Sequence, residues 1–126
     1  MLLDTHLALW YAYEPTRLPK KAAKIISARD SVLTVSWASL WEVAIKASLG
    51  RADFTVVPRQ LADTLVEEGF VLLPLRIEHL SRVLALPWVH RDPFDRMLVA
   101  QAIEEKLTLL TTDRTLAGYG RMVRVL

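Results

Sequence analysis

The chain has 126 residues, the size of one domain with a core of its own, and its mean hydropathy of +0.25 is high for such a domain. It contains no cysteine, which excludes disulfides, thiol nucleophiles and thiolate zinc sites and fits a reducing, cytoplasmic location. The net charge is +2, and no run reaches the roughly 20 apolar residues that a membrane helix needs. We therefore expect a single domain over residues 1–126 with no membrane segment and with part of its apolar surface covered by a partner.

Short apolar or β-branched runs predict strands, and apolar residues at helical spacing, ended by Gly or Pro, predict helices. In chain order, the predicted elements are a strand at 1–3, helices at 5–13 and 20–29, a strand at 31–35, helices at 36–49 and 58–68, a strand at 70–75, helices at 77–86 and 92–106, and strands at 107–111 and 121–126. Strands that alternate with helices predict an α/β fold with a mainly parallel central sheet of about five strands. Pro74 indicates that the third strand lies at an edge of that sheet.

Five acids are expected to meet at one rim of this sheet. Asp4 and Asp113 each follow a predicted strand, Asp92 and Asp95 lie in the first turn of a helix, and Glu42 lies about two turns into another. Sites of open α/β sheets form beyond the carboxyl ends of the strands. Clustered carboxylates repel one another without a cation, and Mg²⁺ and Mn²⁺ prefer oxygen ligands. The rim therefore predicts a divalent metal site suited to phosphodiester hydrolysis.

Each acid also has a structural interpretation that needs no metal. Asp92 and Asp95 suit the start of a helix, where they cap it and favour its dipole, and Asp113 suits a turn. Glu42 matches a capping box, although the serine at the end of the preceding strand is the better cap. Asp4 resists such an interpretation, because the threonine that follows it could cap the helix.

Other side chains accompany the acids. Expected supporting hydroxyls are Thr5, Ser36 and Thr111, which orient water or carboxylates or merely cap. Expected substrate contacts, or local charge balance, are His90, Arg91, Arg96 and Arg114. A surface or packing role rather than metal binding is expected for His6 and His79, and core packing rather than base stacking for Trp37 and Trp41. No phosphate-binding glycine loop, dinucleotide fingerprint or nucleophile elbow occurs, which argues against those chemistries.

The charge balance changes when the rim is set aside. Without the five candidate acids, 9 acids remain against 16 Lys plus Arg. A basic periphery around an acidic, metal-filled centre would suit a polyanionic substrate, whereas the alternative is an ordinary solvated surface. Charge counts alone leave both interpretations open.

Four segments resemble the motifs of PIN domains, and more narrowly those of VapC-type toxin ribonucleases of prokaryotic toxin–antitoxin pairs. They are residues 2–6, 35–46, 90–102 and 109–113, and they stand in the family's order. The resemblance implies a PIN-like three-layer α/β/α sandwich. The family's acid quartet falls on Asp4, Glu42, Asp95 and Asp113, with Asp92 as a helper.

The resemblance also implies a Mg²⁺- or Mn²⁺-dependent endoribonuclease that cuts RNA as the toxin of a type II pair. Asp4, Asp95 and Asp113 would hold metal directly or through water, and Glu42 would ligate it or position the attacking water. The implied partners are a second copy, giving a homodimer, and a small antitoxin that covers an apolar groove. Two alternatives are a PIN nuclease of RNA processing or decay without an antitoxin, and a catalytically silent RNA-binding PIN module. Members usually carry more residues before the first strand, so we expect that strand to be weakly anchored here.

Overall fold

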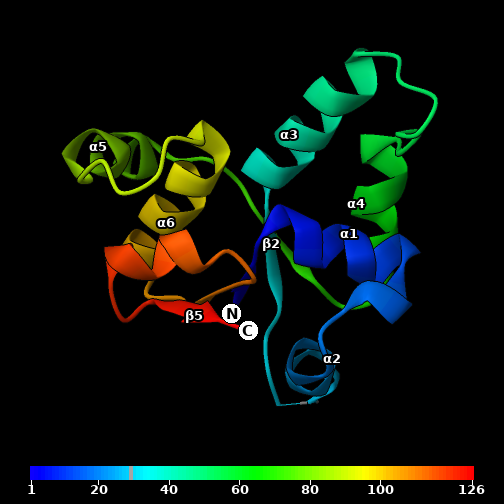
Figure 1. Cartoon of the computed structure of the whole chain (residues 1–126), viewed down its shortest axis with the longest axis horizontal. Coiled ribbons are helices and arrows are strands. Elements are labelled where there is room, and N and C mark those ends of the chain that lie inside the picture. The colour runs from blue at the N-terminus through cyan, green and yellow to red at the C-terminus, as the bar shows by residue number, and fades with distance from the viewer. Residues whose placement is uncertain (29) are drawn as a thin grey trace.

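The structure, a computed structural model, describes residues 1–28 and 30–126 (Figure 1). Its strands are β1 (Leu2–Leu3), β2 (Thr34–Ser36), β3 (Val71–Leu73), β4 (Leu109–Thr111) and β5 (Val123–Val125). Its helices are α1 (Thr5–Tyr13), α2 (Lys20–Ser27), α3 (Trp37–Ser48), α4 (Pro58–Glu67), α5 (Ile77–Ala85) and α6 (Pro93–Glu105), with 3₁₀ helices η1 (Pro15–Arg17) and η2 (Arg114–Tyr119). The strands of the described chain form one parallel sheet in the order β3-β2-β1-β4-β5. The predicted α/β fold with a five-stranded parallel sheet is confirmed.

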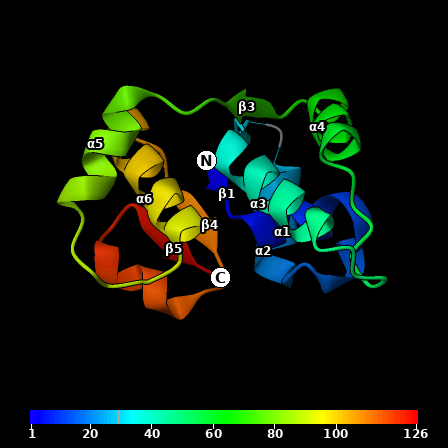
Figure 2. The same ribbon diagram turned by 90° about the horizontal axis from the view of Figure 1, so that it is seen from above.

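Helices cover both faces of the sheet, because successive strand side chains point to opposite sides. Leu3 and Leu110 pack with the buried faces of α1, α2 and α4, whereas Leu2 and Leu109 pack with α6 and η2. Figure 2 shows α5 and α6 on one side and α1, α2 and α4 on the other, with α3 between them. This arrangement is the three-layer α/β/α sandwich, with a separate apolar core on each face.

The first strand lies at the centre of the sheet. Leu2 and Leu3 are fully buried and pair with β2 on one side and β4 on the other. The N-terminal amine of Met1 also donates to the carbonyl of Val32 across 2.8 Å. The expectation that this strand is weakly anchored is therefore wrong, because two ladders and two cores hold it.

Most predicted element boundaries lie close to those observed. β3 is an edge strand, as Pro74 indicates, and α3 and α4 end shortly before Gly50 and Gly69, which have φ angles of 69° and 90° that favour glycine. β2 begins at Thr34, later than predicted, and the predicted end of the second helix at residue 29 lies outside the described residues. η1 and η2 were not predicted. Within the described residues, every helix is too short or too polar to span a membrane.

Candidate metal-binding active site

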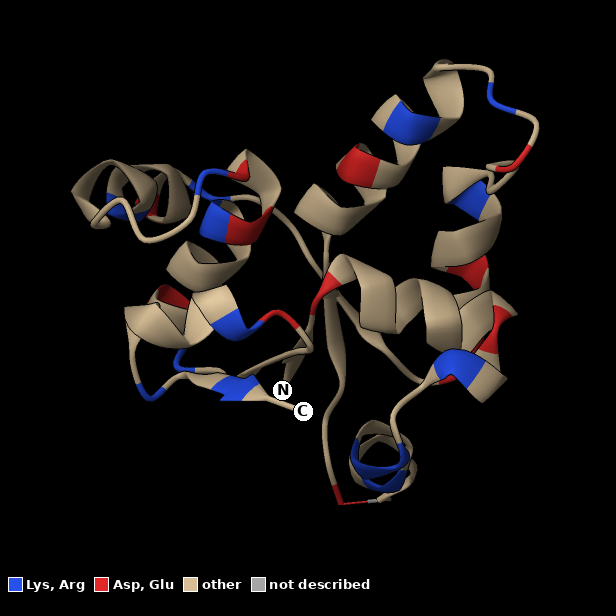
Figure 3. Ribbon diagram, viewed as in Figure 1, with Lys and Arg blue, Asp and Glu red and all other residues tan. Residues whose placement is uncertain are grey.

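The parallel sheet brings the strand-end acids together. β1 and β4 are neighbours in register, and the amide of Asp4 donates to the carbonyl of Leu110 across 3.0 Å, so Asp4 and Asp113 leave adjacent strands at the same edge. β2 lies on the other side of β1 and leads into α3, which carries Glu42. Figure 3 shows acidic positions at the start of α1, on α3, on α6 and after β4 around the same central region. The topology thus gathers the carboxylates at one rim.

Asp4 has a partner for each carboxylate oxygen although its side chain is almost fully buried. Oδ1 accepts from the amide of Leu7 across 2.8 Å, and Oδ2 accepts from the hydroxyl of Thr111 across 2.6 Å. Burial raises the pKa of Asp4, and these hydrogen bonds oppose the rise. Asp4 is also the N-cap of α1, so the view that it has no capping role is wrong. It caps a helix and contributes a carboxylate to the rim at once.

Glu42 is held by residues on two helices. Ser36 caps α3 by accepting from the amide of Ala38 across 2.9 Å, which leaves Glu42 free of a capping box, as expected. Oε1 of Glu42 accepts from the hydroxyl of Thr5 across 2.8 Å, and Oε2 of Glu42 lies 2.9 Å from Nζ of Lys46. Lys46, one turn further along α3, was missed in the sequence. The four-residue spacing between Glu42 and Lys46 was the pattern that could have predicted this ion pair.

Ser39 is a second residue that sequence reasoning missed at the site. Its Oγ lies 2.9 Å from the hydroxyl of Thr5, and both residues are buried. One threonine hydrogen serves one acceptor, so Ser39 donates to Thr5 while Thr5 donates to Glu42. Ser39 lies three residues before Glu42 on α3, which places both on the face toward α1.

Asp95 has the most strongly perturbed carboxyl group of the site. Burial, followed by the charge of Asp92, raises the pKa of Asp95 to about 7. Asp4 and Glu42 raise it further, and His90 opposes the rise. Three other carboxylates act on Asp95, so the rim concentrates negative charge that a divalent cation would offset.

Asp92 begins α6 as its N-cap. Its Oδ1 accepts from the amides of Phe94 and Asp95, across 2.8 and 3.1 Å. The capping interpretation therefore accounts for Oδ1 of Asp92, and the charge of Asp92 reaches Asp95 through that placement.

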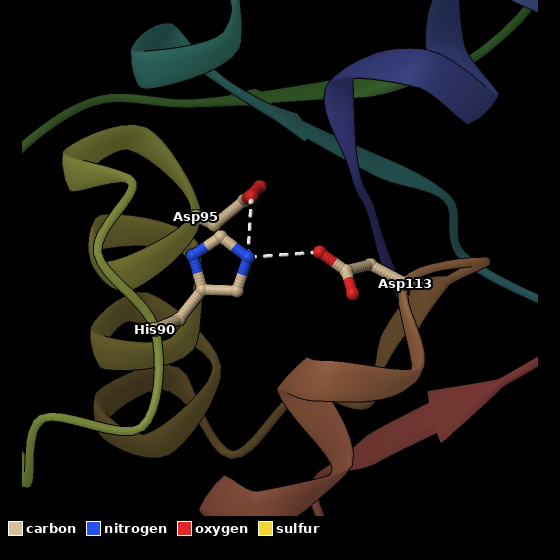
Figure 4. Close-up of side chains that lie close together, drawn as sticks. All are labelled: His90, Asp95 and Asp113. Carbon is tan, nitrogen blue, oxygen red and sulfur yellow. Dashed lines mark hydrogen bonds and ion pairs between the residues drawn. The ribbon is translucent and has the colours of Figure 1, made fainter.

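Among the described residues, His90, Asp95 and Asp113 form a group whose possible ligand atoms all lie within 4.8 Å of one another (Figure 4). Nε2 of His90 lies 2.8 Å from Oδ2 of Asp113 and 3.7 Å from Oδ2 of Asp95. Burial alone would raise the pKa of Asp113, but the hydrogen bonds from His90 and from the amide of Thr115 outweigh it, and the pKa is lowered. Asp113 is thus held as a carboxylate.

The tautomer of His90 follows from its hydrogen bonds. Nδ1 lies 3.0 Å from the amide nitrogen of Asp92, which can only donate, so Nδ1 carries no proton. The ring proton is therefore on Nε2 and points at Asp113. In this arrangement His90 donates to a carboxylate rather than offering a lone pair to a metal, so the oxygen donors are the better ligands.

A family model described as "PIN domain" matches residues 1–121. The chain belongs to the PIN-domain family. This PIN domain is similar to "Ribonuclease VapC22" of Mycobacterium tuberculosis (strain ATCC 25618 / H37Rv), with 32% identity over 94% of this chain and 91% of the relative.

Two solved structures share the fold of this PIN domain. "Crystal structure of VapBC2 from Rickettsia felis bound to a DNA fragment from their promoter" matches with a TM-score of 0.71 and 13% identity, over 98% of this chain and 96% of the other. "Toxin-antitoxin complex from Klebsiella pneumoniae" matches with a TM-score of 0.66 and 17% identity, over 98% and 95%. At these identities the likeness establishes the three-layer fold.

The three arginines expected beside the site of the PIN domain differ in exposure. Arg91 and Arg114 are exposed and lie next to the rim acids in sequence. Arg96 is buried, and its guanidinium donates to the carbonyls of Val83 and Pro87. Arg96 therefore does not suit the substrate contact expected of it, because its donors are turned into the protein.

Both tryptophans that were expected in the core lie at the surface of the PIN domain. Trp37 is 52% exposed and Trp41 is 57% exposed, so the expectation of core packing is wrong. The ring of Trp41 meets Phe94 edge-on at 5.2 Å, beside the start of α6.

His79, by contrast, is fully buried and its Nδ1 accepts from the amide of Arg76, which confirms its packing role. His6 is exposed and stacks obliquely near Trp10.

Proposed function

We propose that this PIN domain is a Mg²⁺- or Mn²⁺-dependent endoribonuclease that acts as the toxin of a type II toxin–antitoxin pair in the cytoplasm. The observation that carries the proposal is the convergence of four carboxylates at one rim. Asp95 and Asp113 have carboxylate oxygens within 4.8 Å of each other, and the charges of Asp4 and Glu42 add to the burial that raises the pKa of Asp95. The name of the relative from Mycobacterium tuberculosis, a VapC ribonuclease, supports the same activity.

The donor set fits a hard divalent cation. Carboxylate oxygens of Asp4, Asp95 and Asp113 would hold the ion directly or through water, and no thiol is available to favour a softer metal. When bound, such an ion neutralises charge on the phosphate and lowers the pKa of a bound water. Burial is the main cause of the raised pKa of Asp95, and the neighbouring carboxylates add to it. This supports the assignment, because a cation would offset the repulsion among those carboxylates.

The other polar residues of the rim keep the carboxylates in place. Thr111 donates to Asp4, and Thr5 donates to Glu42, so both acids are fixed before substrate arrives. Glu42 is then placed to ligate the ion or to orient the water that attacks the phosphorus. Arg91 and Arg114, exposed at the same rim, supply positive charge for the flanking phosphates.

An antitoxin and a second copy of the chain are the proposed protein partners. Large apolar side chains are exposed at four-residue spacing along α3 and at its C-cap, at Trp37, Trp41, Ile45 and Leu49. Others are exposed at three- and four-residue spacing along α5, at Ile77, Leu80 and Leu84. Exposed apolar stripes of this kind are typical of surfaces that a partner covers. The similar structure from Klebsiella pneumoniae is itself a toxin–antitoxin complex.

Incubation of the pure protein with total RNA and Mn²⁺, with and without EDTA, tests the activity, and mapping of the cut ends defines the substrate. Cleavage that EDTA stops and Asp4→Asn abolishes would support the proposal. RNA binding without cleavage would favour a silent RNA-binding module instead. Cleavage by a chain with no antitoxin gene beside its own would favour a nuclease of RNA processing or decay.

A further inference from the structure

His90 reaches both ends of η2. Its backbone amide donates to the hydroxyl of Tyr119, at the last residue of η2, across 3.0 Å. Its ring donates to Asp113, the N-cap of the same short helix, across 2.8 Å. The segment 87–92 that carries His90 has no regular secondary structure, so these contacts decide where the imidazole points.

Arg96 ties the same segment to α5 and α6. From its place on α6, Arg96 donates through Nη1 to the carbonyl of Pro87 across 2.9 Å and to the hydroxyl of Tyr119 across 3.1 Å. Its Nη2 donates to the carbonyl of Val83 across 3.1 Å. The ring of Trp88 lies over the guanidinium, 4.0 Å away. A charged donor with three acceptors and a ring above it is a rigid anchor.

Packing between η2 and the segment leaves no spare room. A Cβ atom added at Gly118 would lie 2.6 Å from Cγ1 of Val89, the residue before His90. That distance is shorter than real Cβ contacts allow, and the branched valine has little freedom to move away. The close contact between Gly118 and Val89 is independent of the hydrogen bonds, and it also fixes the position of segment 87–92 against η2.

We propose that Arg96 and Tyr119 are positioning residues that clamp segment 87–92, so that the His90 imidazole holds the Asp113 carboxylate toward Asp95. This inference rests on the proposed nuclease function for its catalytic consequence, but the placement of His90 is testable without it. Residues that orient a metal-binding carboxylate typically change metal affinity or activity by about 10- to 100-fold when removed.

Tyr119→Phe is the decisive variant, because it removes one hydroxyl and keeps the ring. We expect a Mn²⁺ dissociation constant about tenfold weaker and a kcat for RNA about tenfold lower, with KM little changed. Long-range ¹⁵N–¹H spectra of His90 are expected to change from the single Nε2–H tautomer to a mixture. Tyr11→Phe is the matched control, since it also loses one hydroxyl hydrogen bond, to Glu68, far from the rim.

A second pair of variants tests the clamp by packing alone. Gly118→Ala is expected to displace Val89 and to weaken Mn²⁺ binding and cleavage as Tyr119→Phe does. Adding Val89→Ala to it restores the space, so the double variant is expected to recover both. Recovery of this kind would not follow if Gly118→Ala merely damaged the fold.

The outcomes separate the clamp from the nuclease proposal. If Tyr119→Phe and Gly118→Ala lower the melting temperature but leave the His90 spectrum and Mn²⁺ affinity as in the wild type, the positioning role is wrong. If the wild type never cuts RNA, the nuclease proposal fails, while the His90 spectrum and Mn²⁺ affinity of the same variants still decide the clamp.

Discussion

The hydroxyl of Thr111 donates to Oδ2 of Asp4 across 2.6 Å, and the Thr111 hydroxyl oxygen in turn accepts from the amide of Asp113 across 3.0 Å. One buried threonine therefore links the acid that follows β1 to the acid that follows β4. The hydrogen bond between Thr111 and Asp4 joins residues that lie 107 positions apart in the sequence.

Thr111→Val is expected to destabilise the protein by about 1–3 kcal/mol, because it leaves a buried oxygen of Asp4 and a backbone amide without a partner. Urea unfolding measures the loss. Thr112→Val is the matched control, since Thr112 contacts Asp4 through its backbone only. Equal stability of the two variants would show that the hydroxyl bond contributes nothing.

Amide substitutions of the four rim acids are expected to remove Mn²⁺-dependent RNA cleavage while keeping side-chain shape. Because changes in supporting residues alone cost about 10- to 100-fold, we expect losses of at least about 100-fold here. The variants are Asp4→Asn, Glu42→Gln, Asp95→Asn and Asp113→Asn. Asp63→Asn, on the exposed face of α4, should cleave as the wild type does. Full activity in any rim variant would remove that acid from the site.

The metal-free protein is expected to lose stability as pH rises toward neutrality. The pKa of Asp95 is about 7 in the folded protein against an ordinary 3.8, so the native state keeps a proton that the unfolded state has lost. The stability that the protonated Asp95 carboxyl contributes is fully present below about pH 4 and is lost as pH rises through about pH 7. Unfolding of the wild type and of Asp95→Asn between about pH 5 and pH 8 measures the effect. Parallel curves for the two proteins would contradict it.

Lys46→Met is expected to tighten Mn²⁺ binding when no RNA is present. Nζ of Lys46 lies 2.9 Å from Glu42, so its positive charge opposes a cation at the rim. Removing a unit charge at this range is worth about 1 kcal/mol, or about fivefold in affinity. Calorimetric titration checks this, with Lys24→Met on the exposed face of α2 as control. Weaker binding by Lys46→Met would show that the lysine supports the site instead.

Local sequence patterns predict most of the fold. Apolar runs, proline and glycine positions predict the alternation of strands and helices, and the rule that sites form beyond parallel strand ends predicts that Asp4 and Asp113 meet. The rule works because Asp4 directly follows β1 and a single residue, Thr112, separates Asp113 from the end of β4, so no loop redirects either acid.

The features that were not predicted from the sequence depend on tertiary contacts. The local sequence suggests that Arg96 is a surface charge, but in the fold its guanidinium donates to the carbonyl of Val83 on α5 and to that of Pro87 in segment 87–92. α3 is apolar on more than one side, so its period does not say whether Val43 or Trp41 faces the core. The placement of His90 depends on η2, which no local pattern predicted.

The central claim is that carboxylates from distant segments share one divalent ion. Crystals soaked in Mn²⁺, with anomalous scattering measured at the manganese edge, test it most directly. We predict a single strong peak about 2.0–2.2 Å from carboxylate oxygens of Asp4 or Asp95, on the side facing Asp113. A manganese peak elsewhere on the protein, or none at the rim under conditions in which RNA is cut, would contradict the account.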